Sequence, residues 1–375
     1  MRVLIAPDKF KGTLTAREAA EAIAEGWRKI RPNDELDLFP ISDGGDGFGE
    51  ILGGHLHAEE RRVETVDAAH RPIQAKWWFE PDRGLAIVES AQVIGLAMLP
   101  PGQFHPFDLD TFGLGEVFRA VATARPRLLF VGIGGSATND GGFGMARSLG
   151  WRFLDASGAP IEKWMQLRSL ARIERPKREL KLPLMKVAMD VRNRLLGVRG
   201  ATQIYGPQKG LLPADIKPAE QRLRRLALVM DKGLGGHRTA AKRPGAGAAG
   251  GLGYGLSVFM CGRLTRGFKL FQDRTGLKDR IEVVDLVLTG EGAIDISTVA
   301  MGKGVGGLAR LSKRKGIPCL ALAGVVTSDS RWLKDSFSGV CAMAPTLTTR
   351  EEAMAQPAFW LRELASRISA SWTDS

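Results

Sequence analysis

The sequence predicts an α/β protein in which a parallel sheet carries helices on both faces and a second α/β domain is inserted into the first. Short apolar runs alternate with helical patterns near both ends of the 375-residue chain, and the middle contains a hairpin pattern. A chain of this length is typical of two domains. We expect a discontinuous domain at residues 1–65 and 284–375, and an inserted domain at residues 66–283.

The N-terminal part predicts a strand, a loop, a helix and a second strand. The apolar run at residues 2–7 ends before Asp8, and Thr15 and Glu18 have the spacing of a capping box at the start of a helix. A second strand is expected at residues 36–41.

The C-terminal part shows the same alternation. We expect a strand at 283–288, a helix at 305–315, strands at 318–323 and 340–344, and a terminal helix. The two ends together therefore predict a Rossmann or flavodoxin-like parallel sheet.

The middle of the chain has a different pattern. Apolar and polar residues alternate at 73–79, a turn follows at 81–84, and an apolar run returns at 85–88, which predicts a hairpin. A buried strand is expected at 128–133, directly before a glycine-rich loop.

Composition narrows the class of protein. The net charge is +12, from 53 Lys and Arg against 41 Asp and Glu, and only 3 cysteines are present, so a disulfide framework is not expected. No apolar stretch is long enough to span a bilayer, and we expect a cytoplasmic protein without a membrane partner. Basic residues cluster at 168–181, but aromatic residues do not interleave them as in a single-strand binding groove, so no nucleic acid partner is expected.

The loop after the strand at 128–133 predicts an anion site. Gly134 and Gly135 would let a phosphate approach backbone N–H groups, with Ser136 beside them. Asn139 and Asp140 follow, either as ligands of a metal-bound phosphate or a polyhydroxy substrate, or as caps of the next helix.

The same loop also permits a dinucleotide site. Gly132, Gly134 and Ala137 match a loose fingerprint, and Asp155 follows at the end of a possible strand. The crowded polar residues of the loop favour the phosphate interpretation, and an NAD-dependent oxidoreductase remains the alternative.

Acidic residues follow several predicted strands. Asp8, Asp43 and Asp190 each come after an apolar run, and Glu291 and Asp295 follow the strand at 283–288. Because ligands bind at the carboxyl ends of strands in open parallel sheets, we expect these carboxylates at a binding site.

Lysines and a further glycine-rich loop add to this pattern. Lys11, Lys209 and Lys303 are candidate partners of phosphate or carboxylate groups, although a loop lysine is often only solvated. The loop at 244–253 offers only backbone groups, for an anion or for close packing of helices. Acids, cations and anion loops together indicate phosphoryl transfer, whereas no HEXXH or GxSxG motif is present.

The ordered motifs resemble those of the bacterial-type glycerate kinase family across nearly the whole chain. The matching segments are Ala6–Leu14, Ser42–Gly47, Ile133–Gly142, Tyr205–Gly210, Pro244–Gly253 and Thr289–Gly292. The resemblance implies a two-domain glycerate 2-kinase that uses ATP and Mg²⁺ in the cleft between its domains, gives 2-phosphoglycerate, and is a monomer or homodimer.

Roles follow from this resemblance as hypotheses. Asp190 is expected to be the base, with Lys11, Lys209 and Asp295 also catalytic, and Asp140 and Asp295 are expected to hold the metal, with Asp43 in reserve. The residues expected to bind substrate or nucleotide are Asp8, Asp43, Gly134, Gly135, Ser136, Asn139, Gly245, Gly247, Gly290, Glu291 and Lys303.

The chain also departs from the family pattern. Phe48, Arg194, Ala293 and Ser297 stand where Thr, Pro, Arg and Gln are usual. Ala293 matters most, because an Arg there could pair with a carboxylate or phosphate. The departures leave open a kinase for another small hydroxy acid, or an inactive descendant that only binds.

Overall fold

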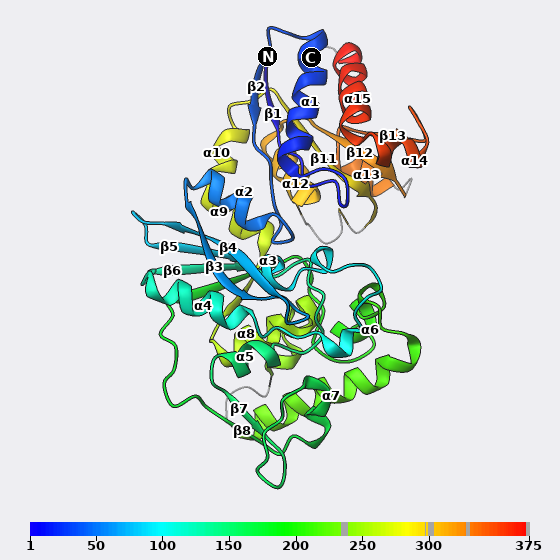
Figure 1. Cartoon of the computed structure of the whole chain (residues 1–375). Coiled ribbons are helices and arrows are strands. Elements are labelled where there is room, and N and C mark those ends of the chain that lie inside the picture. The colour runs from blue at the N-terminus through cyan, green and yellow to red at the C-terminus, as the bar shows by residue number, and fades with distance from the viewer. Residues whose placement is uncertain (234–238, 297, 299–303, 328–330, 373–375) are drawn as a thin grey trace. The chain divides into compact units, whose positions relative to one another are not determined.

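The computed structural model describes residues 1–233, 239–296, 298, 304–327 and 331–372 (Figure 1). The chain divides into two compact units. The first unit consists of residues 1–43 and 268–375, and the second consists of residues 44–267. The mixed α/β fold expected from the sequence is confirmed.

The first unit contains a five-stranded parallel sheet in the order β13-β12-β11-β1-β2. Counted along the unit, this is the 2-1-3-4-5 order of flavodoxin-like folds, in which the strand order reverses between β1 and β11. The strands are β1 (Arg2–Ile5), β2 (Glu35–Leu38), β11 (Leu286–Ile294), β12 (Cys319–Val326) and β13 (Gly339–Ala344).

Helices α1 and α15 lie side by side in the first unit (Figure 1). The expected capping box begins α1, where Thr15 Oγ1 accepts from the Glu18 backbone N–H and Glu18 accepts from the Thr15 backbone N–H at 2.8 Å. Ile23 and Trp27 of α1 share one core with Leu288 of the sheet. The helices of this unit are α1 (Ala16–Ile30), α9 (Gly267–Thr275), α10 (Leu277–Ile281), α12 (Gly304–Lys315), α13 (Arg331–Ser336), α14 (Arg350–Ala355) and α15 (Pro357–Ser371).

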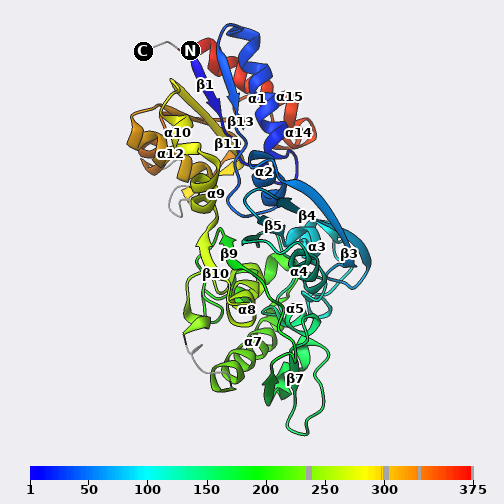
Figure 2. The same ribbon diagram turned by 90° about the vertical axis from the view of Figure 1, so that its left-hand side faces the viewer.

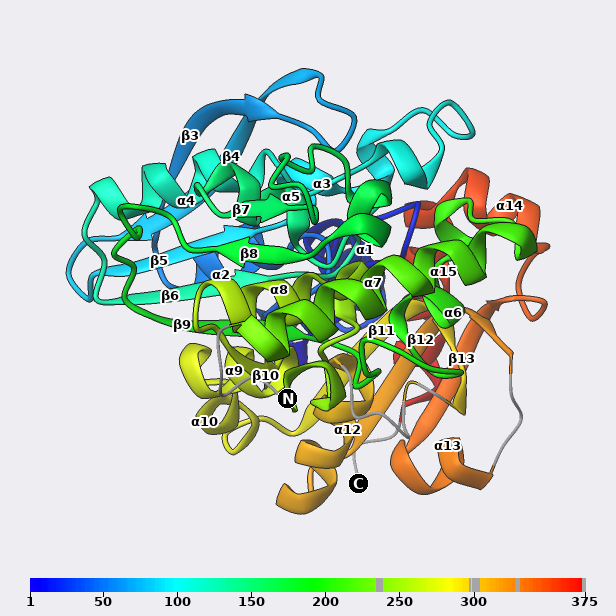
Figure 3. The same ribbon diagram turned by 90° about the horizontal axis from the view of Figure 1, so that it is seen from below.

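The second unit contains a six-stranded mixed sheet in the order β10-β9-β6-β5-β4-β3. β10, β9, β6 and β5 are parallel, whereas β4 pairs antiparallel with β5 and β3, so the hairpin predicted from the sequence is confirmed. Figure 3 shows β5, β6 and β9 side by side. These strands are β3 (Glu59–Val66), β4 (Pro72–Glu80), β5 (Leu85–Glu89), β6 (Leu128–Gly132), β9 (Leu184–Met189) and β10 (Arg263–Arg266).

The remaining elements of the second unit pack around this sheet. A small antiparallel pair is formed by β7 (Arg152–Leu154) and β8 (Arg172–Glu174), with α7 lying against it. Helix α8 lies against β9 and β10 (Figure 2). The helices are α2 (Phe48–His55), α3 (Ala91–Ile94), α4 (Leu114–Thr123), α5 (Phe143–Ser148), α6 (Ala201–Tyr205), α7 (Pro213–Gly233) and α8 (Leu252–Phe259).

The boundaries of the units differ from the sequence-based boundaries at 65/66 and 283/284. Residues 44–65 group with the second unit for two reasons. β3 pairs with β4, and α2 packs closely on β4, since a Cβ on Gly49 would lie 1.9 Å from the Trp78 ring. Residues 268–283 group with the first unit, where the Phe271 ring packs at 6.1 Å from that of Phe39.

Within the described part of the chain, no helix combines the length and the apolar character that a bilayer crossing requires.

Candidate active site

Three carboxylates of the first unit, those of Asp8, Asp43 and Glu291, lie close to one another toward the carboxyl ends of β1, β2 and β11. Asp8 follows β1, its backbone N–H donates to the Gly290 carbonyl oxygen at 2.9 Å, and Glu291 is the next residue of β11. Burial and the charges of Asp43 and Glu291 raise the pKa of Asp8 well above its usual range. The carboxylates therefore lie at the switch point between β1 and β11, where ligands bind in such sheets.

Lys11 is presented on a tight turn beside the same strands. The backbone N–H of Phe10 donates to the Leu14 carbonyl oxygen at 2.9 Å, and Gly12 at the tip has φ +81°. Lys11 is exposed, and a Cβ on Gly292 would lie 3.2 Å from its backbone nitrogen. The Lys11 side chain is thus outside the hydrophobic core and can contact an anion near the end of β11.

The strand predicted at 283–288 was expected to end before Thr289, with Thr289–Gly292 in the loop after it, and this prediction is wrong. The segment lies inside β11, which runs on to Ile294 and pairs with β12. Gly290 permits this pairing, since a Cβ there would lie 2.1 Å from the Leu322 carbonyl oxygen. Its role in the structure is close strand packing.

Asp295 comes directly after β11 and is linked to Glu291 through one hydroxyl. The Thr298 backbone N–H donates to Asp295 Oδ1 at 3.1 Å, and Thr298 Oγ1 donates to Glu291 Oε1 at 2.8 Å. Ala293 is exposed in the same strand, so no cation stands at that position. Ser297 and Lys303 lie outside the described residues.

The glycine-rich loop after β6 holds the second group of candidate residues. Ser136 Oγ and the Thr138 carbonyl oxygen accept hydrogen bonds from Lys209 Nζ at 2.8 and 2.5 Å. Lys209 is 6% exposed, and burial lowers the pKa of its amine to about 7. Lys209 therefore holds the loop after β6 in place through hydrogen bonds made in the interior of the second unit.

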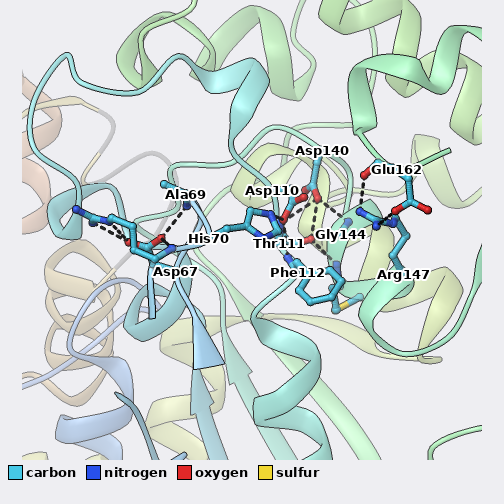
Figure 4. Close-up of polar contacts among 12 residues, drawn as sticks. Asp67, Ala69, His70, Asp110, Thr111, Phe112, Asp140, Gly144, Arg147 and Glu162 are labelled. Carbon is cyan, nitrogen blue, oxygen red and sulfur yellow. Dashed lines mark hydrogen bonds and ion pairs between the residues drawn. The ribbon is translucent and has the colours of Figure 1, made fainter. Parts of the chain in front are cut away.

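Asp140 is wholly buried and its carboxylate is occupied by donors of its own chain. It accepts from the Thr111 hydroxyl at 2.8 Å and from the backbone N–H groups of Thr111, Gly142 and Gly144 at 3.0, 3.1 and 2.9 Å. Figure 4 shows this arrangement, in which Asp110 lies between Asp140 and His70. Burial, and then the Asp110 charge, raise the pKa of Asp140 to about 6. This geometry suits a cap of α5 rather than a metal ligand.

Gly134 and Gly135 contact the Ser42–Gly47 segment closely. The Gly134 backbone N–H donates to the Gly44 carbonyl oxygen at 3.0 Å, and a Cβ on Gly135 would lie 1.4 Å from the Asp46 carboxylate. Asn139 is buried and donates to Thr202 Oγ1 at 3.0 Å. Both glycines are thus required by the packing of two loops.

The loop at 244–253 packs against the loop after β6. The Gly141 backbone N–H donates to the Gly250 carbonyl oxygen at 3.1 Å. A Cβ on Gly245 would lie 2.2 Å from the Met189 sulfur, and one on Gly247 would lie 2.2 Å from the Arg194 carbonyl oxygen. The glycines of this loop therefore allow close packing, which is the second of the two roles predicted for it.

Gly250→Ala should be strongly destabilising. Gly250 has φ +63°, and a Cβ there would lie 1.9 Å from the Thr138 carbonyl oxygen. Backbone strain alone costs about 1–3 kcal/mol, and the overlap adds to it. Urea unfolding measures the difference against Gly158→Ala, where φ is +87° but nothing lies within 4 Å. Equal losses in the two variants would show that the loops do not pack closely.

Asp190 lies at the carboxyl end of β9, next to the loop that follows β6. β6 and β9 are paired, and the Ile133 backbone N–H donates to the Ala188 carbonyl oxygen at 3.2 Å. Asp190 is half-buried, and burial together with the Asp190 charge raises the pKa of Tyr205 to about 12. A carboxylate at this edge is placed to meet a ligand held by the same loop.

The structure weakens the dinucleotide alternative. Asp155 follows β7, which belongs to the small β7-β8 pair and not to the sheet that contains β6. Its carboxylate accepts from Ser157 Oγ at 2.7 Å within an exposed turn. The acid expected to bind a ribose is thus part of a local turn.

Sequence reasoning missed Glu89, which ends β5 and is 2% exposed. Its two carboxylate oxygens accept from the backbone N–H groups of Gly47 and Gly49 at 2.8 and 2.9 Å. Phe48 between them is fully buried, and a Cβ on Gly132 would lie 2.4 Å from its ring. Phe48 is therefore a core residue, and an acid directly after the apolar run at 85–88 was the available signal for Glu89.

Among the described residues, no three side chains of His, Cys, Asp or Glu are placed to hold a metal ion. Mg²⁺ commonly takes one or two protein carboxylates and completes its shell with substrate phosphates and water. The mutual proximity of Asp8, Asp43 and Glu291 fits such partial ligation better than Asp140 does.

The first unit has a flavodoxin-like parallel sheet with acids at its switch point, and the second has a glycine-rich loop between strand and helix. Both features are typical of α/β enzymes that bind phosphate groups. The glycerate kinase family model matches residues 3–373. The chain therefore belongs to the glycerate kinase family and is a kinase.

Curated relatives and a solved structure are similar over most of the chain. A glycerate kinase of Halalkalibacterium halodurans is 36% identical over 379 residues, covering 100% of this chain and 99% of the relative. The glycerate 2-kinase of Escherichia coli K12 is 35% identical over 88% of this chain and 86% of its own length. A crystal structure of a Salmonella typhimurium LT2 protein assigned as glycerate kinase 2 has a TM-score of 0.80 at 34% identity, covering 99% of this chain and 98% of that one.

Proposed function

We propose that this protein transfers the γ-phosphoryl group of ATP to the 2-hydroxyl of glycerate, giving 2-phosphoglycerate and ADP. The observation that carries the proposal is the family match over residues 3–373, together with relatives named glycerate kinase and glycerate 2-kinase. The carboxylates at strand ends in each unit supply the acids that such a reaction needs.

Asp190 is the proposed base. Its carboxylate would take the proton of the substrate hydroxyl while the hydroxyl oxygen forms a bond to the γ-phosphorus and the bond to the ADP oxygen breaks. Because the transition state of phosphoryl transfer is loose, the base needs no strongly perturbed pKa. Its position at the end of β9, beside the loop after β6, supports this role.

The lysines have different proposed roles. Lys11 is exposed on its turn and would neutralise phosphate or carboxylate oxygens of a substrate. Lys209 is buried and fastens Ser136 and Thr138, so it would act by positioning the loop rather than by touching the substrate.

Mg²⁺ would neutralise charge on the phosphate groups of ATP. Asp8, Asp43, Glu291 and Asp295 are the carboxylates of the first unit that would contribute ligands. The proposal does not use Asp140, whose oxygens already accept four hydrogen bonds. A cytoplasmic location, and a monomeric or homodimeric state, stay predictions.

Glycerate-dependent release of ADP tests the proposal directly. The pure protein with ATP and Mg²⁺ should release ADP when D-glycerate is added and not in its absence. Release of ADP with another small hydroxy acid but not with glycerate would identify a different substrate. The departure from the family pattern at Ala293 allows this outcome. No release with any acceptor would indicate a protein that only binds.

Nucleotide choice separates the kinase from an NAD-dependent oxidoreductase. A ligand stabilises the folded state by mass action, by about 2.7 kcal/mol at 100 times its dissociation constant. ATP with Mg²⁺ should therefore raise the melting temperature by several degrees, whereas NADH should leave it unchanged. The reverse pattern would favour the oxidoreductase.

A further inference from the structure

A cavity of about 700 Å³ lies in the second unit and contains none of the candidate catalytic, substrate-binding or metal-binding residues. Its walls come from the segment after α5, from residues 175–182 between β8 and β9, and from the end of α8. Small-molecule sites in proteins commonly have volumes of about 300–1,000 Å³. The cavity is thus large enough for an organic ligand.

The cavity lies at a distance from the candidate active-site loops. Helices α5 and α8 begin directly after Gly142 and Gly251, in the two glycine-rich loops, and the cavity lies where both helices end. The six residues of α5 span about 9 Å and the eight residues of α8 span about 12 Å, so one helix length separates the two places. A ligand in the cavity would therefore be distinct from the substrate of the loops.

One wall of the cavity is aromatic and apolar. Trp151 and Phe259 are 6% and 7% exposed, and their ring centroids lie 5.1 Å apart in an edge-on arrangement. Val258 and Leu182 extend this wall. Such a surface suits the apolar body of a ligand, because burying it removes apolar area from water.

The rim carries three cations and one carboxylate. Arg175 pairs with Glu179 at 2.9 Å and also lies over the Trp151 ring, 5.8 Å from its centroid. Arg178 and Lys181 are exposed and make no ion pair or hydrogen bond with any described residue. Two cations thus stand uncompensated beside an apolar wall, which is the arrangement that recognises an anion with an apolar body.

We propose that this cavity is a second binding site, for a small organic anion whose apolar body lies on Trp151 and Phe259 and whose anionic group lies beside Arg178 and Lys181. The site does not depend on the proposed phosphoryl transfer. Attraction by rim cations is screened by salt, so binding should weaken as ionic strength rises.

Titration with anilinonaphthalene sulfonate, an aromatic ring system with one anionic group, tests the site at low ionic strength. We expect saturable binding of one equivalent. The double variant Arg178→Glu/Lys181→Glu should weaken it by about tenfold, whereas Lys217→Glu on the exposed face of α7 should leave it unchanged. Excess ATP and glycerate should not displace the probe.

Two results would overturn the proposal. Unchanged affinity in the double variant would place the probe elsewhere, and displacement by ATP would place it at the nucleotide site. Because neither side chain has a described partner, the double variant should keep its melting temperature. If its melting temperature falls, the double variant Arg178→Gln/Lys181→Gln is used instead. Loss of probe binding is expected in that variant, and retained binding would contradict the site.

Discussion

Asp190→Asn should lower turnover by about 100-fold or more while leaving the fold intact. Asn keeps the size of the side chain but cannot accept the proton of the substrate hydroxyl, and a positioned base contributes about 10²–10⁴-fold. Asp190 follows β9 and is half-buried, and Asn has nearly the same volume, so little packing should be lost. Steady-state kinetics with saturating ATP and glycerate measure the effect as a fall in kcat.

The matched control is Asp82→Asn, an exposed carboxylate in the turn between β4 and β5 of the same unit. Its activity should equal that of the parent protein. Near-normal kcat in a folded Asp190→Asn protein would remove Asp190 from the role of base, and Asp43 would be the next carboxylate to test.

Lys209→Met should change how stability depends on pH, and should also lower activity by freeing the loop at Ser136 and Thr138. Burial lowers the pKa of Lys209 in the folded protein to about 7, against 10.5 for its ordinary value. The unfolded chain therefore binds more protons between these values, so the wild-type free energy of unfolding should rise with pH from about 7 toward 10.5. The effect is several kcal/mol, since one pKa unit corresponds to about 1.4 kcal/mol.

Urea unfolding of both proteins at pH 7, 8 and 9 measures this difference. The stability of the wild type should increase relative to that of Lys209→Met as the pH rises, and Lys217→Met, on an exposed face, should follow the wild type. Parallel curves for wild type and Lys209→Met would mean that the buried amine keeps its ordinary pKa, so that its burial is not as described.

Local patterns predicted many elements of the fold. The capping box at Thr15 and Glu18 and the hairpin lie at the predicted residues, and the strands near both chain ends overlap the predicted ranges, although β11 continues to Ile294. These features depend on neighbouring residues in the sequence, so the sequence contains the information that determines them.

Other features depend on contacts that local patterns do not contain. Thr289–Gly292 is a strand because β12 pairs beside it, and Asp155 lies away from the main sheet because β7 pairs with β8. Residues 44–65 belong with the second unit because of their pairing and packing with β4. Glycines and an aspartate in a loop suggested ligand binding. In the structure, Gly250 packs against the Thr138 carbonyl oxygen, and the Asp140 carboxylate accepts hydrogen bonds from its own chain.

The most direct test of the account is the identity of the phosphorylated product. The protein is incubated with ATP, Mg²⁺ and D-glycerate, and the product is passed to enolase with and without phosphoglycerate mutase. Phosphoenolpyruvate formed without the mutase, as the account predicts, identifies 2-phosphoglycerate. Formation only with the mutase would show 3-phosphoglycerate, and no product under either condition would contradict glycerate phosphorylation.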